Sequence, residues 1–203
     1  MDLGLLLRGL VIGFSIAAPV GPIGVLCIRR TLAGGRGYGL ASGLGAASAD
    51  AVYGMVGGFG LTFVSSFLIS QEAALRLVGG LFLAYLGLKT FRAHPAANPA
   101  QAQASGLPGA YLSTFLLTLT NPLTILSFAA IFAGLGVHRA ADGYGAALLL
   151  VIGVFLGSAA WWLLLSGGVS LLRGALTPAR LRWINRLSGA ILLGFGAAAL
   201  LAI

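Results

Sequence analysis

Six apolar stretches, separated by short polar or basic segments, dominate the pattern of hydrophobic and polar positions along this chain. Their lengths approach or exceed the roughly 20 residues with which a helix crosses the hydrocarbon core of a bilayer. The stretches run over Leu5–Ile28, Tyr38–Phe67, Ala73–Leu88, Ala110–Val137, Tyr144–Leu172 and Leu187–Ile203. The pattern therefore predicts an all-α integral membrane protein with six transmembrane helices, of which the second and fifth are long enough to be tilted.

A polar segment divides the six stretches into two groups of three. It covers residues 93–109, where three prolines and several amide side chains interrupt the chain without apolar periodicity, as in a linker. We therefore expect a first three-helix repeat over residues 1–92, a cytoplasmic linker, and a second three-helix repeat over residues 110–203. Because an odd number of spans in each half turns the second half upside down, the pattern predicts two inverted repeats.

Composition limits the classes of protein that fit this pattern. Of the 203 residues, 59% are hydrophobic and 8% are charged, against about 25% charged in a typical soluble domain. The mean hydropathy of +1.01 spreads the excess over the whole chain, which excludes a soluble domain on a single anchor. The net charge of +8 does not indicate a nucleic-acid partner, because no basic stretch is long enough to form a solvated domain. The expected partner is the lipid bilayer.

The distribution of lysine and arginine predicts how the chain is oriented. Nine of these residues fall in or beside the first, third and fifth loops: Arg29, Arg30, Arg36, Lys89, Arg92, Arg173, Arg180, Arg182 and Arg186. Three fall on the other side: Arg8, Arg76 and Arg139. Since cytoplasmic loops carry the excess of positive charge, loops one, three and five are predicted in the cytoplasm and both termini outside.

Prolines interrupt the first and fourth stretches at comparable positions. The first stretch holds Ala18-Pro19-Val20-Gly21-Pro22, where the missing proline N–H groups leave the carbonyls of Ser15 and Ala18 without helical donors. The fourth stretch holds Asn121-Pro122, and Pro122 is expected to free the carbonyl of Thr118 in the same way. Both helices are therefore predicted to be broken inside the membrane.

Such paired breaks predict a central site, because free backbone groups at membrane depth must be buried in protein or line a watery cavity. The candidate substrate-binding residues at the breaks are Pro19, Gly21, Pro22, Asn121 and Pro122. The N–H groups where each helix restarts suit an anion such as a substrate carboxylate. A single proline kink is also common as a purely structural feature of membrane helices, but two kinks in matching places favour a site.

Asp50 is the one acidic residue well inside a stretch. A charged carboxylate at that depth costs a few kcal/mol, so the group is expected to be neutral, paired or facing a polar cavity. It is a candidate to exchange a proton or to hold a substrate ammonium, and a structural carboxyl bonded between helices is the alternative. On a helix, Tyr53 and several small residues share its face. Tyr53 is therefore a further candidate for substrate binding, with packing or an interhelical hydrogen bond as the alternative.

Small residues also form one face of the fifth stretch. Gly145, Gly153, Gly157 and Trp161 recur there at multiples of four, a spacing that lets helices approach closely. The Trp161 indole is a candidate to close over a ligand. Packing and anchoring at the membrane interface are the alternatives for this residue.

The sequence offers no pattern for catalysis or for a metal centre. His94 and His138 lie in predicted loops, so neither a Ser-His dyad nor an HExxH motif can form within the bilayer, and a GxxxxGK[ST] loop is absent. Cys27 is the single cysteine and has no metal-ligand neighbour. We expect no enzyme activity, no cofactor and no metal site.

The motifs in order along the chain resemble the LysE/RhtB family of bacterial amino-acid exporters, over nearly the full length. The residues that carry the resemblance are Ala18 to Gly24, the turn with Gly34, Arg36 and Gly37, the stretch around Asp50, Gly80 to Lys89, Asn121-Pro122 and Asn185 to Gly196. The family usually has lysine or a similar residue directly after its Asn-Pro, whereas this chain has Leu123. A role for a charge at that position is therefore not carried over.

The resemblance implies a secondary exporter of amino acids or related small metabolites in the bacterial inner membrane, coupled to the proton gradient. Combined with the predicted repeats, it favours alternating access around a midplane site, with carboxylate bound at the broken helices and ammonium or proton at Asp50. Two alternatives stay open. One is efflux of cations or heavy metals, for which soft ligands are scarce, and the other is a non-transporting membrane scaffold. The small-residue faces also leave a homodimer open.

Overall fold

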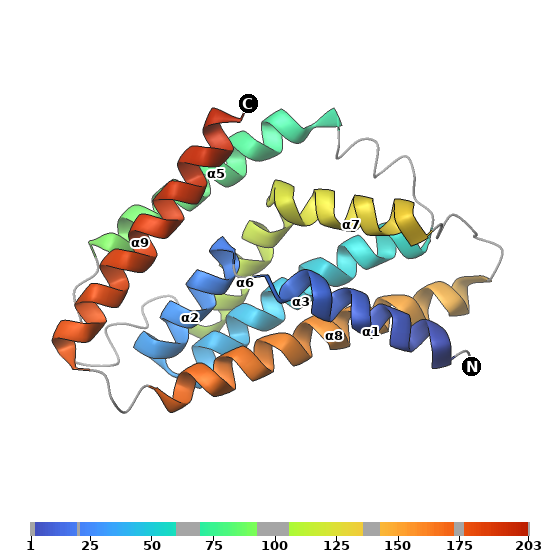
Figure 1. The fold of residues 1–203 in the computed structure, drawn as a ribbon, viewed down its shortest axis with the longest axis horizontal. Coiled ribbons are helices and arrows are strands. Elements are labelled where there is room, and N and C mark those ends of the chain that lie inside the picture. Colours follow the sequence, from blue (N-terminus) through green and yellow to red (C-terminus); the bar gives the residue numbers. More distant parts are fainter. Residues whose placement is uncertain are drawn as a thin grey trace.

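The computed structural model describes residues 3–19, 21–59, 70–92, 106–135, 143–172 and 177–202, and these ranges are almost wholly α-helical (Figure 1). The helices are α1 (Leu3–Ala17), α2 (Pro22–Gly34), α3 (Arg36–Gly58), α5 (Glu72–Phe91), α6 (Gly106–Leu119), α7 (Pro122–Leu135), α8 (Gly143–Leu171) and α9 (Pro178–Leu201). The predicted all-α class is confirmed. Residues 60–67 of the second stretch and 93–105 of the linker lie outside the described ranges, and α6 begins within the predicted linker.

The two predicted breaks are present. The axis of α1 turns by 80° into α2, and that of α6 turns by 59° into α7. Within the described residues, three single helices, in α5, α8 and α9, are long and apolar enough to cross a membrane, and the count rises to five if each bent pair is one span. The helix α3 is not among these spans, because its many glycines and Asp50 keep its hydropathy below the level that a span requires.

The basic turn after the first stretch lies further along the chain than the sequence predicts. Arg29 and Arg30, expected in loop one, belong to α2, which ends at Gly34. Gly35 then adopts a φ of 98° and donates its N–H to the carbonyl of Thr31 at 2.9 Å. A positive φ costs glycine little, so the chain reverses there directly into α3.

Glycines allow α1 and α8 to lie side by side along their length (Figure 1). An added methyl group at Gly9 or Gly13 would overlap a backbone carbonyl of α8, and one at Gly153 or Gly157 would overlap a carbonyl of α1. The small-residue face predicted for the fifth stretch thus contacts α1 at Gly153 and Gly157. Gly145, by contrast, has open space around it.

The remaining contacts place α3 at the centre. It packs against α8 on one side and α6 on the other, while α5 and α9 form a long pair at one edge of the molecule (Figure 1). The predicted face of α3 is confirmed, because Gly43 lies against Trp162 and Asp50 is bonded to Ser158. The pair of α5 and α9 reaches the rest of the bundle mainly through α2.

Candidate functional site

The two helix breaks and Asp50 surround one cavity of about 260 Å³. Pro19, Gly21 and Pro22 line it from the first break, Asn121 lines it from the second, and Asp50 reaches it from α3. These residues are separated by up to about a hundred positions in the sequence, and the fold brings them together. Pro122 begins α7 beside them.

Asp50 is buried and held by α8. Its side chain is 3% exposed, and its carboxylate accepts a hydrogen bond from the Ser158 hydroxyl at 2.7 Å. Ser158 in turn accepts a bond from the indole N–H of Trp162 at 3.2 Å, and Trp162 also lines the cavity. Among the described residues no basic side chain forms an ion pair with Asp50. A buried carboxylate without a paired cation is costly, so a proton or a cationic ligand group would stabilise it.

The second break is organised by Asn121. Its side-chain oxygen accepts the N–H of Leu123 at 3.2 Å, and its carbonyl accepts the N–H groups of Thr124 at 3.1 Å and Ile125 at 3.2 Å. Its side-chain amide donates to the Thr124 hydroxyl at 3.0 Å. The first N–H groups of α7 therefore already have partners, so an anion at this end would have to displace the Asn121 side chain or bind its amide.

The carbonyl freed by this break differs from the predicted one. The carbonyl of Thr118 accepts the N–H of Asn121 at 3.2 Å and is not left free. Leu119 is the residue whose helical donor is diverted, because the N–H of Leu123 turns to the Asn121 side chain. The hydroxyl of Tyr53 donates to the Leu119 carbonyl at 2.6 Å and replaces that donor.

The first break presents N–H groups more openly. Gly21 donates its N–H to the carbonyl of Pro19 at 3.0 Å in a tight turn, and nothing lies within 4 Å of the position where a Cβ would stand. The N–H groups of Ile23 and Gly24, in the first turn of α2, have no acceptor inside that helix. Both residues line the cavity. This end of α2 is the better place for an anionic ligand group.

Tyr53 and Trp161 do not line the cavity. Tyr53 stabilises its wall through Leu119 and packs against the ring of Phe128, with 5.4 Å between centroids. Trp161 makes an edge-to-face contact with Phe14 at 5.4 Å. The indole that lines the cavity belongs to the next residue, Trp162.

Sequence reasoning missed Ser158, which holds Asp50, and Phe195, which α9 contributes to the cavity wall. Ser158 and Trp162 are four residues apart on α8, so they share the face that meets Asp50. A search for hydroxyl and indole donors on the small-residue face of the fifth stretch could have found them. The wall residue Phe195 has no such signal, because nothing in its helix marks the side that faces the first break.

Arg30 was also missed, since it was assigned to a loop. Its guanidinium donates to the hydroxyls of Ser42 at 2.9 Å, Thr114 at 2.8 Å and Ser113 at 2.7 Å, and to the carbonyl of Ala110 at 2.9 Å. These acceptors lie on α3 and α6, so Arg30 ties α2 to a helix of each half of the chain. The cluster lies about two helical turns from the level of Asp50, roughly 12 Å along α3.

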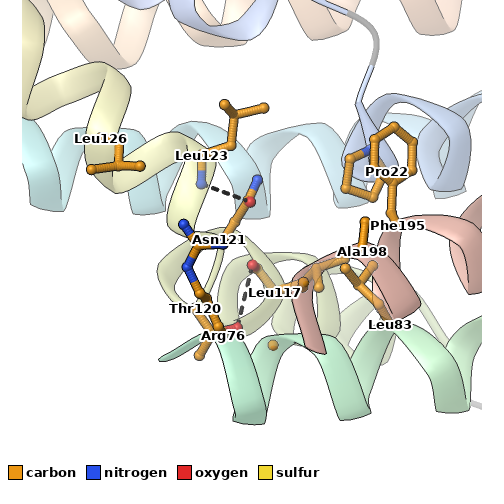
Figure 2. A pocket seen from close by; sticks show the side chains of 12 residues that line it. Pro22, Arg76, Leu83, Leu117, Thr120, Asn121, Leu123, Leu126, Phe195 and Ala198 are labelled. Atoms are coloured by element: carbon orange, nitrogen blue, oxygen red, sulfur yellow. Dashed lines mark hydrogen bonds between the residues drawn. The ribbon is translucent and has the colours of Figure 1, made fainter. Parts of the chain in front are cut away.

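Figure 2 shows the residues that line a second cavity, whose volume is about 230 Å³. The two cavities share Pro22, Asn121, Leu123 and Phe195 in their walls. The second cavity lies between the α5 and α9 pair and the broken helix of α6 and α7, and its other lining side chains are mostly apolar. Figure 2 shows Asn121 in the wall of the second cavity, with its bond from the N–H of Leu123 drawn as a dashed line.

Broken helices around a cavity that holds a buried carboxyl group are an arrangement found in membrane transporters. The LysE type translocator family matches residues 14–202 of the chain. The chain belongs to this family and is a membrane transporter. Family members are translocators and not enzymes.

Two relatives show how far the similarity extends. The chain is 31% identical to the "Putative amino acid efflux protein YcgF" of Bacillus subtilis over 202 residues, which cover 96% of this chain and 94% of that protein. It is also 31% identical to the "Uncharacterized membrane protein YahN" of Escherichia coli over 147 residues, which cover 71% of this chain and 65% of that protein. No solved structure matches the chain.

Proposed function

We propose that this translocator is a secondary active exporter of amino acids or related small metabolites, coupled to the proton gradient and working by alternating access. The observation that carries the proposal is the cavity that contains both helix breaks and the buried Asp50 carboxyl. Membership of the LysE type translocators and the efflux name of the Bacillus relative support it. An amino acid has one anionic and one cationic group, and the cavity offers a partner for each.

In the proposed binding mode, the carboxylate lies at the start of α2 and the ammonium lies at Asp50. The unpaired N–H groups and the positive end of the helix dipole favour an anion at the first position. Asp50 accepts one hydroxyl bond and has further acceptor capacity for an ammonium. When the substrate leaves, a proton takes its place on Asp50, which couples export to proton entry.

We further propose six spans in two inverted repeats, with α3 as the span that is less apolar because it carries the site. The helix contacts support this pairing. In such a repeat, α1 and α2 correspond to α6 and α7, α3 to α8, and α5 to α9. Under this correspondence the contact of α1 with α8 in one repeat becomes the contact of α6 with α3 in the other, and both are observed. The contacts of α3 with α8 and of α5 with α9 each join a helix to its own counterpart.

Orientation follows the basic residues. We propose the bacterial inner membrane, with loops one, three and five in the cytoplasm and both termini outside. Arg30 and its acceptors then lie on the cytoplasmic side of the cavity, where they hold α2, α3 and α6 together. Opening toward the cytoplasm would require this cluster to separate. A homodimer through exposed helix faces is compatible with the arrangement.

The test of function is a comparison of the culture medium of cells with and without expression of the chain. We expect one amino acid, or a small set, to accumulate outside the expressing cells, and the accumulation to stop when a protonophore removes the proton gradient. Efflux of preloaded amino acids gives the same result on a shorter timescale. Metal resistance without amino-acid release would support the cation-efflux alternative, and no released solute of either kind would support the scaffold.

A further inference from the structure

Both cavities are lined mostly by apolar surface, and they differ in the polar groups that they hold. The first holds the polar groups Asp50, Asn121, Thr118, Thr124 and Ser127. The second is lined mainly by hydrocarbon, from Leu83, Leu117, Leu126, Phe195, Ala198 and Ala199. Because the cavities share four wall residues, a ligand bound in the first lies directly beside the second.

Charge sets a further limit on what the second cavity can hold. Among the side chains that the structure describes, Asp50 is the one acidic group that lines either cavity, and Arg76 is the charged group that lines the second. If the α-ammonium of an amino acid takes Asp50, a lysine or arginine substrate would bring a second cation among apolar side chains and near another cation. Burying an unpaired charge is strongly unfavourable, so the walls select against basic substrates.

We propose that the second cavity is the side-chain subsite of the transport site, and that the exported amino acids carry an uncharged aliphatic side chain of about the size of leucine or methionine. This inference rests on the proposed export function and specifies its substrate class. Apolar walls gain from each methylene group removed from water. The shared wall residues Pro22, Asn121, Leu123 and Phe195 then form the junction between backbone and side-chain recognition.

The test uses the full chain in proteoliposomes and measures counterflow of radiolabelled leucine, alanine, lysine and glutamate. In the wild type, leucine is expected to exchange at least about tenfold more efficiently than lysine or glutamate, in the range by which binding pockets discriminate side chains. Preference for lysine or for glutamate would overturn the proposal. In the latter case Arg76 would be the group that recognises the substrate.

A pair of substitutions on α9 locates the subsite. Ala199→Phe fills the second cavity and is expected to reduce leucine exchange at least about tenfold while alanine exchange is retained. Ala197→Phe is the matched control, because Ala197 is exposed, lines neither cavity and points to the opposite side of α9. If Ala199→Phe does not insert, Ala199→Leu fills the same space with a smaller group. Equal loss of leucine and alanine exchange would overturn the assignment.

The same experiments distinguish an error in the export function from an error in the side-chain subsite. If no amino acid exchanges in wild-type proteoliposomes, the export function itself is wrong. If amino acids exchange but leucine is not preferred, or if Ala199→Phe and Ala197→Phe behave alike, the export function stands and the side-chain subsite is wrong.

Discussion

Replacing Asp50 by asparagine is expected to reduce export at least about 30-fold while the protein stays folded. Truncating one partner of a buried, hydrogen-bonded charge pair costs about 2–5 kcal/mol, which corresponds to this factor or more. Asparagine keeps an oxygen for the Ser158 hydroxyl, which lies 2.7 Å from the Asp50 carboxylate, but it can neither carry a proton nor pair with an ammonium. Initial efflux rates in cells with matched protein levels measure the effect.

The melting temperature of the Asp50→Asn variant separates a functional carboxyl from a structural one. Removing a buried ionisable group that has no paired cation is expected to leave the melting temperature unchanged or to raise it. Ser166→Ala is the matched control on α8, because the Ser166 hydroxyl is buried and has no hydrogen-bond partner within the described structure. That control should export normally. An Asp50→Asn protein that melts lower and still exports would assign Asp50 to structure.

Gly157→Ala is expected to destabilise the protein by about 3 kcal/mol, at the upper end of the range for overpacked sites. The added methyl group would overlap the backbone carbonyl of Leu10 on α1, which cannot move without shifting the whole helix. The expected decrease in melting temperature is roughly 6–12 °C. Thermal unfolding in detergent, together with the monodisperse fraction on size-exclusion chromatography, measures it.

The matched control for this prediction is Gly168→Ala on the same helix. Gly168 is exposed and has nothing within 4 Å of its Cβ position. Alanine there should be neutral or stabilising by up to about 1 kcal/mol, because it favours the helix. Equal melting temperatures for the two variants would contradict the close contact between α1 and α8.

The sequence predicts the helix breaks and the buried carboxyl group, because each depends on the chemistry of a single residue type. Proline lacks an N–H group, so the breaks near Pro19 and Pro122 follow from the sequence wherever a membrane helix is assigned. The cost of a charge in the membrane likewise singles out Asp50, and the structure buries it beside both breaks. These predictions needed no knowledge of how the helices pack.

Contacts between distant segments could not be predicted in the same way. The sequence could not show that Trp162, and not its neighbour Trp161, lines the cavity wall. One position on a helix turns a side chain by about 100°, and only packing fixes that rotation. The guanidinium of Arg30 reaches Thr114, which is 84 positions away along the chain. The second cavity arises where the pair of α5 and α9 meets the broken helix, so it exists only in the assembled bundle.

Protection of a cavity residue by substrate shows whether the first cavity is the transport site. In a Cys27→Ser background, Ser127→Cys places the single thiol in the wall of the first cavity, and Ser170→Cys places it near the end of α8, outside both cavities. We expect a hydrophilic thiol reagent to label Ser127→Cys, and an exported amino acid to slow this labelling several-fold without affecting Ser170→Cys. Labelling of Ser127→Cys at the same rate with and without saturating substrate would contradict the assignment of this cavity as the transport site.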